Sequence, residues 1–379
     1  MRQEVDRVVV VYETQASCEA RLGRFGFGSD VAAEIAVYLA QSADLPEYFE
    51  EIREALAAEG AAVDFVELDA LADLLPTLVA RADRTLLWSQ TDGIRFYRGS
   101  SAPFAARLTG VARYGSSPFA QALCQNKFQC LALAETAGVT ISPTLLLEGR
   151  ETLACLGRLD PSERGFFVKP NTLGGKIGIF ADSRCSSLAE ARERAQRLWD
   201  RYRDRAVVQP FVEGDDVRLS FMDVGGAFAD QLGLARLVKQ PGSETGGAFM
   251  TMKDNQTLSG AKDLRGARGG FGLGHAAAFT PDMVDLRAEK DERSRRARAA
   301  IAEQAERLAR LVGLADYFSM DFRIDETGAP TFFEFETCPA VTIYDFQTYL
   351  RSIHDLSLGA ALARSMRRAH RECRSAAEA

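Results

Sequence analysis

Short apolar runs alternate with amphipathic stretches over the first 115 residues. Runs of β-branched residues are typical of buried strands, and the amphipathic stretches have the spacing of helices. Strands that alternate with helices predict a parallel α/β layer, so we expect residues 1–115 to form a Rossmann-like domain. No GxGxxG motif marks it as dinucleotide-binding. The predicted strands are residues 7–12, 62–68 and 84–89. One predicted helix begins after an N-cap at Ser29 or Asp30 and ends at Leu39, and a second predicted helix spans residues 47–58.

A turn cluster at residues 114–118 (YGSSP) predicts the start of a second unit. Ser117 as N-cap and Pro118 at the first helical position predict a helix to about Ala137. Lys127 falls on the apolar stripe of that helix. A lysine there either extends its ammonium group to solvent or meets a fixed anion.

The segment 165–180 (GFFVKPNTLGGKIGIF) reads as strand, glycine-rich loop and strand, with Lys169 at the end of the first strand. This order differs from the Walker P-loop, in which a helix follows the loop. Gly174 and Gly175 let backbone N–H groups approach phosphate oxygens, and Lys176 adds a positive charge. A hairpin with a surface lysine is common, so the loop gains weight only together with Lys127, Lys169 and an acidic site.

Such a site is predicted near the end of the chain, where strands 318–324 and 331–336 flank the turn 325–328. If Ile324 pairs with Thr331, Asp321 lies opposite Glu334. Alternation then puts Phe333 and Phe335 on one face of the second strand, and Glu334 and Glu336 on the other.

Three carboxylates on one face of an apolar hairpin need a cation, and Mg²⁺ carrying substrate phosphates suits them. The alternative is a solvated acidic face balanced by Arg323. The flanking phenylalanines favour the metal site.

The remaining pattern predicts further strands and helices around these motifs. Residues 242–274 are rich in Gly, Ser and charge, and read either as a lid over a site or as a surface loop. The other predicted elements are helix 188–202, strands 205–211 and 217–224, helix 284–312 and a basic helix after Leu362.

Composition narrows the function classes. With 379 residues, 46% of them hydrophobic, and a net charge of -7, the chain reads as a soluble multidomain protein without a nucleic-acid partner. No apolar run near the start is long enough for a membrane span or signal peptide, and we expect a cytoplasmic location. The seven cysteines include no CxxC pair and predict free thiols, and three histidines make a His-based triad or metal site unlikely.

The motifs KPNTLGGKIGI, QPFVEGDD and MDFRID followed by FFEFETCPAVT, in this order, resemble the ATP-grasp superfamily, and within it the D-alanine–D-alanine ligases. The resemblance covers residues 116–346. It implies an α/β (α+β) ATP-grasp fold with an N-terminal Rossmann-like domain. The implied domains are residues 1–115, a central subdomain 116–208 with the glycine-rich loop, and a C-terminal subdomain 209–379 with the metal site.

The resemblance also implies roles for individual residues, with ATP and two Mg²⁺ ions as cofactors and Mn²⁺ as a possible substitute. Glu13 would hold a substrate ammonium group, although it could equally cap a loop. Lys176, Arg218 and Arg323 are the candidate catalytic cations. The implied nucleotide contacts are Lys127, Lys169, Gly174, Gly175 and Lys253 at the phosphates, Gln209, Pro210, Phe211 and Val212 at the adenine, and Asp216 at the ribose; the implied metal ligands are Asp321, Glu334 and Glu336.

Three positions depart from the ligase pattern. Glu336 stands where the ligases have asparagine, and Ser319 stands where they have an arginine thought to stabilise the oxyanion. Either Arg218 or Arg323 could replace that arginine. Ala340-Val341 replaces a glycine–methionine turn that shapes the amino-acid pocket, so we do not expect two D-alanines as substrates.

The implied activity is an ATP-dependent carboxylate–amine ligase that forms an amide through an acyl phosphate, releasing ADP and phosphate. Small carboxylates and amines are the expected partners, and the relatives suggest a homodimer. The alternatives are an ATP-grasp kinase that stops at a phosphorylated product and a non-catalytic nucleotide-binding regulator.

Overall fold

The N-terminal part of the computed structural model is a parallel sheet of four strands in the order β2-β1-β3-β4. The model describes residues 5–39, 45–91, 99–237, 245, 248–253, 283–339, 341 and 344–378. The parallel α/β layer expected from the alternation of strands and helices is confirmed. Its strands are β1 (Arg7–Tyr12), β2 (Ala62–Glu67), β3 (Thr85–Gln90) and β4 (Ala112–Tyr114), of which the sequence did not predict β4.

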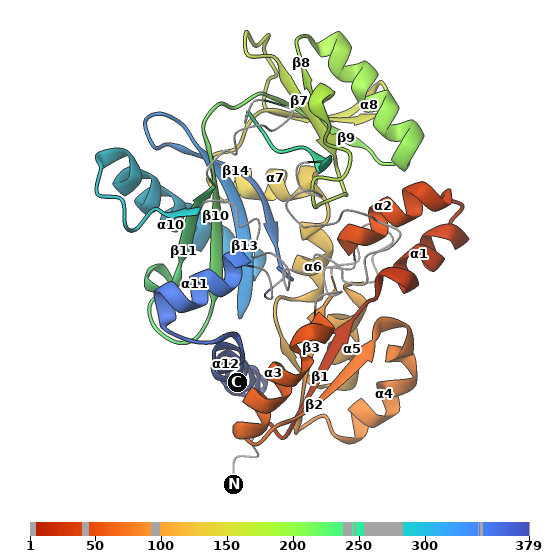
Figure 1. Cartoon of the computed structure of the whole chain (residues 1–379), viewed down its shortest axis with the longest axis vertical. Helices are drawn as coiled ribbons and strands as arrows, with labels where there is room; N and C mark the ends of the chain where they lie inside the picture. The colour runs from red at the N-terminus through yellow and green to blue at the C-terminus, as the bar shows by residue number, and fades with distance from the viewer. Residues whose placement is uncertain are drawn as a thin grey trace.

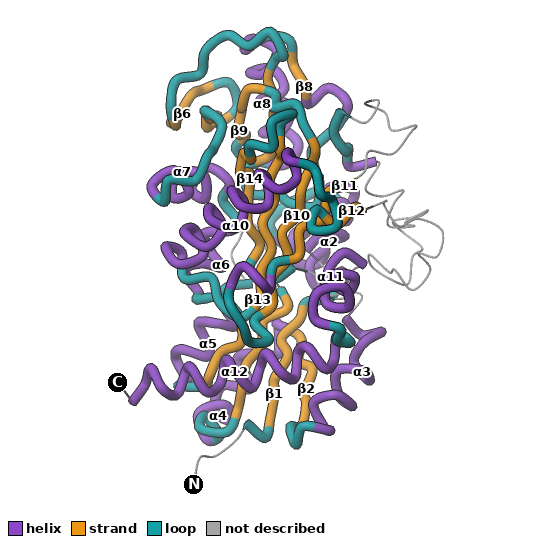
Figure 2. Tube along the Cα trace, turned by 90° about the vertical axis from the view of Figure 1, so that its left-hand side faces the viewer, coloured by secondary structure: helices purple, strands orange, loops and turns teal. Residues whose placement is uncertain are grey.

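Alternate residues of β1 point to two separate cores. Val9 and Val11 pack with α4 (Leu71–Ala80) and α5 (Ser101–Thr109) on one face. On the other face, Val8 and Val10 pack with α3 (Leu45–Ala58) and the C-terminal helix α12 (Leu358–Glu378). Figure 2 shows α12 crossing this sheet, so the end of the chain completes the core of its beginning. The short 3-10 turn η2 (Leu68–Ala70) precedes α4.

Two helices directly after β1 leave the N-terminal sheet and pack elsewhere. These helices, α1 (Gln15–Arg24) and α2 (Ser29–Leu39), form what we call the helical arm. Its apolar face shares a core with β7 and α8 of the central part (Figure 1). Glu34 of α2 accepts hydrogen bonds from the Tyr202 hydroxyl and from Arg201. The sequence pattern predicted α2 but not α1.

The central part is a five-stranded antiparallel sheet in the order β6-β5-β9-β7-β8. The residues after β7 form turns up to residue 178, so no strand leaves the glycine-rich loop directly, contrary to our expectation. The elements are β5 (Thr144–Glu148), β6 (Glu151–Leu156), β7 (Phe166–Pro170), η3 (Ala181–Ser183), β8 (Arg184–Cys185), α8 (Leu188–Tyr202) and β9 (Ala206–Pro210).

The helix predicted from Pro118 to about Ala137 is two helices, α6 (Pro118–Cys124) and α7 (Lys127–Thr136). The expected N-cap of the first is present, since Ser117 Oγ accepts from the Ala120 N–H. Asn126 interrupts the run with an extended backbone, and its side chain accepts from the Gln129 N–H as a second N-cap. Lys127 is therefore the first residue of α7, and it lies on the buried face of that helix with Cys130, Leu131 and Ala134, as predicted.

The C-terminal sheet has five strands in the order β12-β11-β10-β13-β14. One face packs on α7 and on α10 (Glu292–Val312), which begins later than predicted because residues 283–285 form a strand. The other elements are β10 (Asp215–Met222), η4 (Phe228–Gln231), β11 (Gly233–Leu237), β12 (Met283–Asp285), β13 (Tyr317–Ile324), β14 (Pro330–Glu336) and α11 (Tyr344–His354).

The hairpin of β13 and β14 contains an irregularity that decides which side chains face the site. Asp321 lies opposite Glu334 as predicted, but Ile324 pairs with Pro330 and not with Thr331. The register shift between Asp321 and Phe322 leaves Phe333 unpaired, which is a β-bulge. Phe333 therefore does not share the core face of Phe335, which corrects the predicted alternation.

Within the described residues, no helix is long and apolar enough to cross a bilayer.

Candidate functional site

A lysine of the central region meets an acid of the C-terminal hairpin. Lys127 Nζ lies 3.0 Å from Glu334 Oε2 and donates to the Leu173 carbonyl at 2.7 Å. The Lys127 side chain is buried. Burial alone would lower the pKa of Lys127, but the Glu334 carboxylate raises it above its usual value. The Lys127 ammonium group therefore meets a fixed anion and does not extend into solvent.

Lys169 brings a second positive charge to the same place from the end of β7. Its ammonium lies 4.9 Å from the centre of the Phe333 ring, a cation–π contact that the bulge makes available. Burial lowers the pKa of Lys169 to about 8. Although burial alone would raise it, Lys127 and Lys169 lower the pKa of Glu334 to about 2. The lysines and the acidic hairpin thus face one space.

The other two acids of the hairpin share an arginine. Arg218 Nη1 lies 3.3 Å from Asp321 Oδ1, and Arg218 Nη2 lies 2.5 Å from Glu336 Oε2. Arg218 Nη2 also donates to Ser319 Oγ at 2.9 Å. Burial raises the pKa of Asp321 to about 7. Arg218 is therefore the arginine that lies beside Ser319, whereas Arg323 lies elsewhere.

The donor set fits Mg²⁺ in part. Within the described part of the chain, no three Asp, Glu, His or Cys side chains lie close enough together to hold a metal ion. The predicted site of three carboxylates stays a prediction, and Glu336 and Glu334 lie near enough to Asp321 to raise its pKa. Asp321 and Glu334, which face each other across the hairpin, still fit Mg²⁺, because this ion commonly takes one or two carboxylates and completes its shell with phosphates and water.

The glycine-rich loop is held against the start of α7. Asn171 accepts from the N–H of Lys127 at 3.0 Å through its carbonyl, and from that of Phe128 at 2.9 Å through Oδ1. Gly175 and Lys176 have positive φ angles of +54° and +66°, which turn their N–H groups out of an extended backbone.

Lys176 and Lys253 lie near this loop. The charge of Lys176 lowers the pKa values of Asp321 and Glu334, so it acts on the same space as Lys127. Lys253 is exposed, and the preceding Met252 N–H donates to the Ile179 carbonyl at 2.8 Å. Most of the predicted lid, 242–274, lies outside the described residues, and Ala340 does too.

The strand end expected to contact adenine and ribose contacts Arg323. Arg323 donates to the Val212 carbonyl and to Asp216 Oδ1, each at 2.7 Å, and lies 5.7 Å from the centre of the Phe211 ring. The Gln209 amide is buried and donates to Thr144 Oγ1 at 2.9 Å, while Pro210 ends β9. Arg323 thus lies at the strand end that the resemblance assigns to the nucleoside, whereas Arg218 lies beside Asp321 and Glu336.

Part of the sequence and the fold as a whole are similar to those of known proteins. No protein-family model matches the chain. A D-alanine–D-alanine ligase of Geobacter sulfurreducens is 29% identical over 120 residues, which cover 31% of this chain and 35% of that protein. The match therefore spans about a third of that relative's length.

Solved structures match over nearly the whole chain. The D-alanine–D-alanine ligase of Bacillus anthracis, complexed with ATP, has a TM-score of 0.62 at 13% identity and covers 98% of this chain and 100% of its own. The Coxiella burnetii ligase has a TM-score of 0.58 at 11% identity, with 99% and 96% coverage. The protein has the ATP-grasp fold. This finding extends the expected resemblance, which began at residue 116, to the N-terminal domain.

In this ATP-grasp chain Glu13, the expected ammonium ligand, is paired with an arginine. Glu13 and Arg21 of α1 form an ion pair, and their side chains are 1% and 4% exposed. Thr91 Oγ1 lies 3.5 Å from Glu13 Oε2. A buried carboxylate that already has a cationic partner is a structural group first, so the geometry does not favour the expected role of Glu13.

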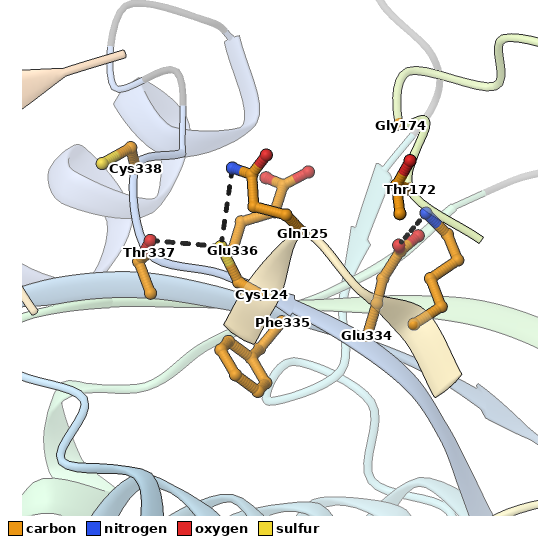
Figure 3. Close-up of a pocket in the computed structure, with 10 residues that line it drawn as sticks. Cys124, Gln125, Thr172, Gly174, Glu334, Phe335, Glu336, Thr337 and Cys338 are labelled. Carbon is orange, nitrogen blue, oxygen red and sulfur yellow. Dashed lines mark hydrogen bonds and ion pairs between the residues drawn. The ribbon is translucent and has the colours of Figure 1, made fainter. Parts of the chain in front are cut away.

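The ATP-grasp site also contains residues that our sequence analysis missed. One cavity joins the groups described above to residues at the end of α6 and in the segment after β14 (Figure 3). It is lined by Lys127, Thr172, Gly174, Glu334, Phe335 and Glu336, and by Cys124, Gln125, Thr337 and Cys338. Cys124 Sγ lies 3.4 Å from Thr337 Oγ1, and Gln121 Nε2 donates to Cys338 Sγ at 3.3 Å. Val341 is fully buried in the N-terminal core and so does not line this cavity. Cysteines without a spacing motif gave no sequence signal for this position.

Proposed function

We propose that the protein is an ATP-dependent carboxylate–amine ligase. The observation that carries the proposal is the contact between Lys127 and Glu334, with Lys169 beside it. It supports one space shared by phosphate-binding lysines and metal-binding acids. The D-alanine–D-alanine ligases named above have this fold and are the source of the reaction class.

In the proposed reaction, Lys127, Lys169 and the N–H groups of Gly174 and Gly175 bind the ATP phosphates. The Pro210–Val212 strand end and Asp216 bind the nucleoside. Mg²⁺, held by Asp321 and Glu334, would neutralise phosphate charge. Phosphoryl transfer needs mainly positioning and charge neutralisation, which these groups supply.

The chemistry then has two steps. An oxygen of the substrate carboxylate attacks the γ-phosphorus, the bond to the bridging oxygen breaks, and ADP leaves. The nitrogen of an amine next attacks the carbonyl carbon of the acyl phosphate, loses a proton, and inorganic phosphate leaves. The acyl phosphate hydrolyses in open water, so a cover over the site is useful.

A screen of phosphate release over pairs of small carboxylates and amines tests the proposal, with the product mass measured for each active pair. We expect release only when both substrates are present, and a product mass equal to their sum minus water. Asp321→Asn is the control that should stop turnover while the fold persists. Full turnover in this variant would contradict the catalytic reading.

The same assay separates the ligase from a kinase. A stable phosphorylated acid that accumulates without any amine would identify a kinase. Binding of ATP without turnover of any pair would favour a nucleotide-binding regulator. Both outcomes would refute the ligase proposal.

A further inference from the structure

The Arg218 side chain, on β10, contacts acids on both strands of the β13–β14 hairpin. Its Nη1 lies 3.3 and 3.4 Å from the two Asp321 oxygens, whereas its Nη2 lies 2.5 Å from Glu336 Oε2. Ser319 Oγ accepts from Nη2 and donates to Glu336 Oε2 at 3.2 Å. The tighter contact is therefore with Glu336, and Ser319 connects the two groups.

The strand register produces this arrangement. Arg218 of β10 lies directly opposite Asp321 of β13, and Ser319 of β13 lies directly opposite Glu336 of β14. Directly opposed side chains on a sheet are in contact distance. The fully buried Ser319 is short, so the guanidinium can reach across it to Glu336.

The two departures from the ligase pattern are thus in contact with one another. An arginine at position 319 would occupy the place that the Arg218 guanidinium takes, and an asparagine at position 336 would leave that guanidinium without its closest anion. Guanidinium–carboxylate contacts are strong and directional, and partly buried ones fix the arginine in place. Only 17% of the Arg218 side chain is exposed.

We propose that Ser319 and Glu336 are positioning residues that hold Arg218, and that Glu336 is not a third metal ligand. This inference rests on the proposed function. Asp321 and Glu334 remain the metal-binding pair, and Arg218 supplies a fixed positive charge beside the phosphates. The described residues contain no three-carboxylate group that could hold a metal, which agrees with this division.

A double-mutant cycle of Arg218→Met and Glu336→Gln in the metal-free, nucleotide-free protein tests the contact itself. We expect the two losses of unfolding free energy to be clearly less than additive, because each change removes the same contact. Additive losses would overturn the positioning role. This part of the test does not depend on any enzymatic activity.

Binding of Mn²⁺ in the presence of a non-hydrolysable ATP analogue, followed by electron paramagnetic resonance, tests the ligand role. For Glu336→Gln we expect the wild-type number of bound Mn²⁺ ions and less than about a threefold change in Kd. Asp321→Asn, the matched ligand control, should weaken Mn²⁺ binding by about tenfold or more. Loss of one Mn²⁺ ion in Glu336→Gln would show that Glu336 is a ligand and overturn the inference.

Phosphate release completes the set. With an active substrate pair, Glu336→Gln should lower kcat by roughly 10- to 100-fold, the range for a residue that orients a site group. The double variant should be no slower than Arg218→Met alone. If the wild type binds the Mn²⁺–nucleotide complex but releases no phosphate with any pair, the proposed function fails while the first two measurements still decide the role of Glu336.

Discussion

Lys127 Nζ and Glu334 Oε2, 207 positions apart in the chain, lie 3.0 Å apart. The contact joins the start of α7 to the edge strand of the C-terminal sheet, and it neutralises the acid that Lys169 also faces. A triphosphate that reaches Lys127 and Lys169 would thus lie against this hairpin.

Lys127→Met should weaken catalysis with ATP strongly. It removes a positive charge expected at the phosphates and leaves Glu334 with only Lys169 and Lys176 among the lysines that lower its pKa. We expect kcat/KM for ATP to fall by about 100-fold or more, the scale of one electrostatic contact in a transition state. Steady-state kinetics measures this, with the exposed Lys290→Met as control; equal effects of the two changes would contradict the assignment.

Loss of the proton from Lys169 should make kcat/KM for ATP fall at mildly alkaline pH, which gives the pH–rate profile a descending limb. Burial lowers its pKa to about 8, so the free protein loses this charge as the pH rises through 8. We expect kcat/KM for ATP to fall above this pH, approaching tenfold per unit, because kcat/KM reports groups of the free enzyme. Lys169→Arg should remove the limb, since arginine stays charged. A limb that persists in this variant belongs to another group.

Arg323→Met should affect nucleotide binding more than chemistry. Arg323 holds Val212 and Asp216, and both lie at the predicted nucleoside end. We expect KM for ATP to rise about tenfold, with kcat within about threefold of the wild type, as expected for loss of binding that is uniform along the reaction. The exposed Arg205, paired with Glu148 on the central sheet, gives the control Arg205→Met. A large fall in kcat alone would instead place Arg323 at the reacting phosphate.

Glu13→Gln should lower the free energy of unfolding, because the buried Arg21 guanidinium then loses the negative charge with which it forms an ion pair. Breaking a buried ion pair typically costs about 3–5 kcal/mol. The double change Glu13→Gln and Arg21→Met should recover part of that loss. Denaturant unfolding measures both. If Glu13→Gln leaves stability unchanged and raises KM for the amine substrate, Glu13 holds an ammonium group as first expected.

Stability should also fall as the pH rises through about 7. Burial raises the pKa of Asp316 to about 7, with Glu372 and Asp223 adding to the rise and the Gly115 N–H and Arg113 opposing it. A carboxyl group whose pKa is higher in the folded state stabilises that state fully only below its pKa in the unfolded chain, near 3.8. This stabilisation is lost as the pH rises through the pKa in the folded state.

Asp316→Asn tests this contribution. Asparagine tolerates the positive φ of +62° and can still accept from the Gly115 N–H. We expect the variant to be about 1–2 kcal/mol more stable relative to the wild type at pH 8 than at pH 5, a discounted figure because Asp316 is only partly buried. An unchanged pH profile would assign the slope to other groups.

The sequence was sufficient for features that local patterns determine. Apolar periodicity identified the first three strands, and the Ser117-Pro118 pair identified the start of a helix. The pairing of Asp321 with Glu334 was also correct, although the register assumed at Ile324 was wrong. The bulge at Phe333 absorbs that one-residue shift, and nothing in the run of phenylalanines announces it.

Features that depend on tertiary contacts could not be read from local patterns. Asn126 ends one helix and caps the next, but its neighbours have helical spacing on both sides. The choice between Arg218 and Arg323 depended on which strand lies beside β13, and propensity does not give strand order. The Glu13–Arg21 pair was hidden because the polar stretch after β1 did not read as a helix.

The helical arm connects the N-terminal sheet to the central part of the chain, which bears Lys169. The arm starts two residues after Glu13, carries Arg21, and is hydrogen-bonded to α8 through Glu34 and Tyr202. A swing of the lobe that bears Lys169 would either carry α1 and α2 with it or break those bonds. A movement of the phosphate-binding lysines would then change the geometry of the Glu13–Arg21 ion pair at the start of the arm. Nucleotide binding would in this way alter the structure at the end of β1.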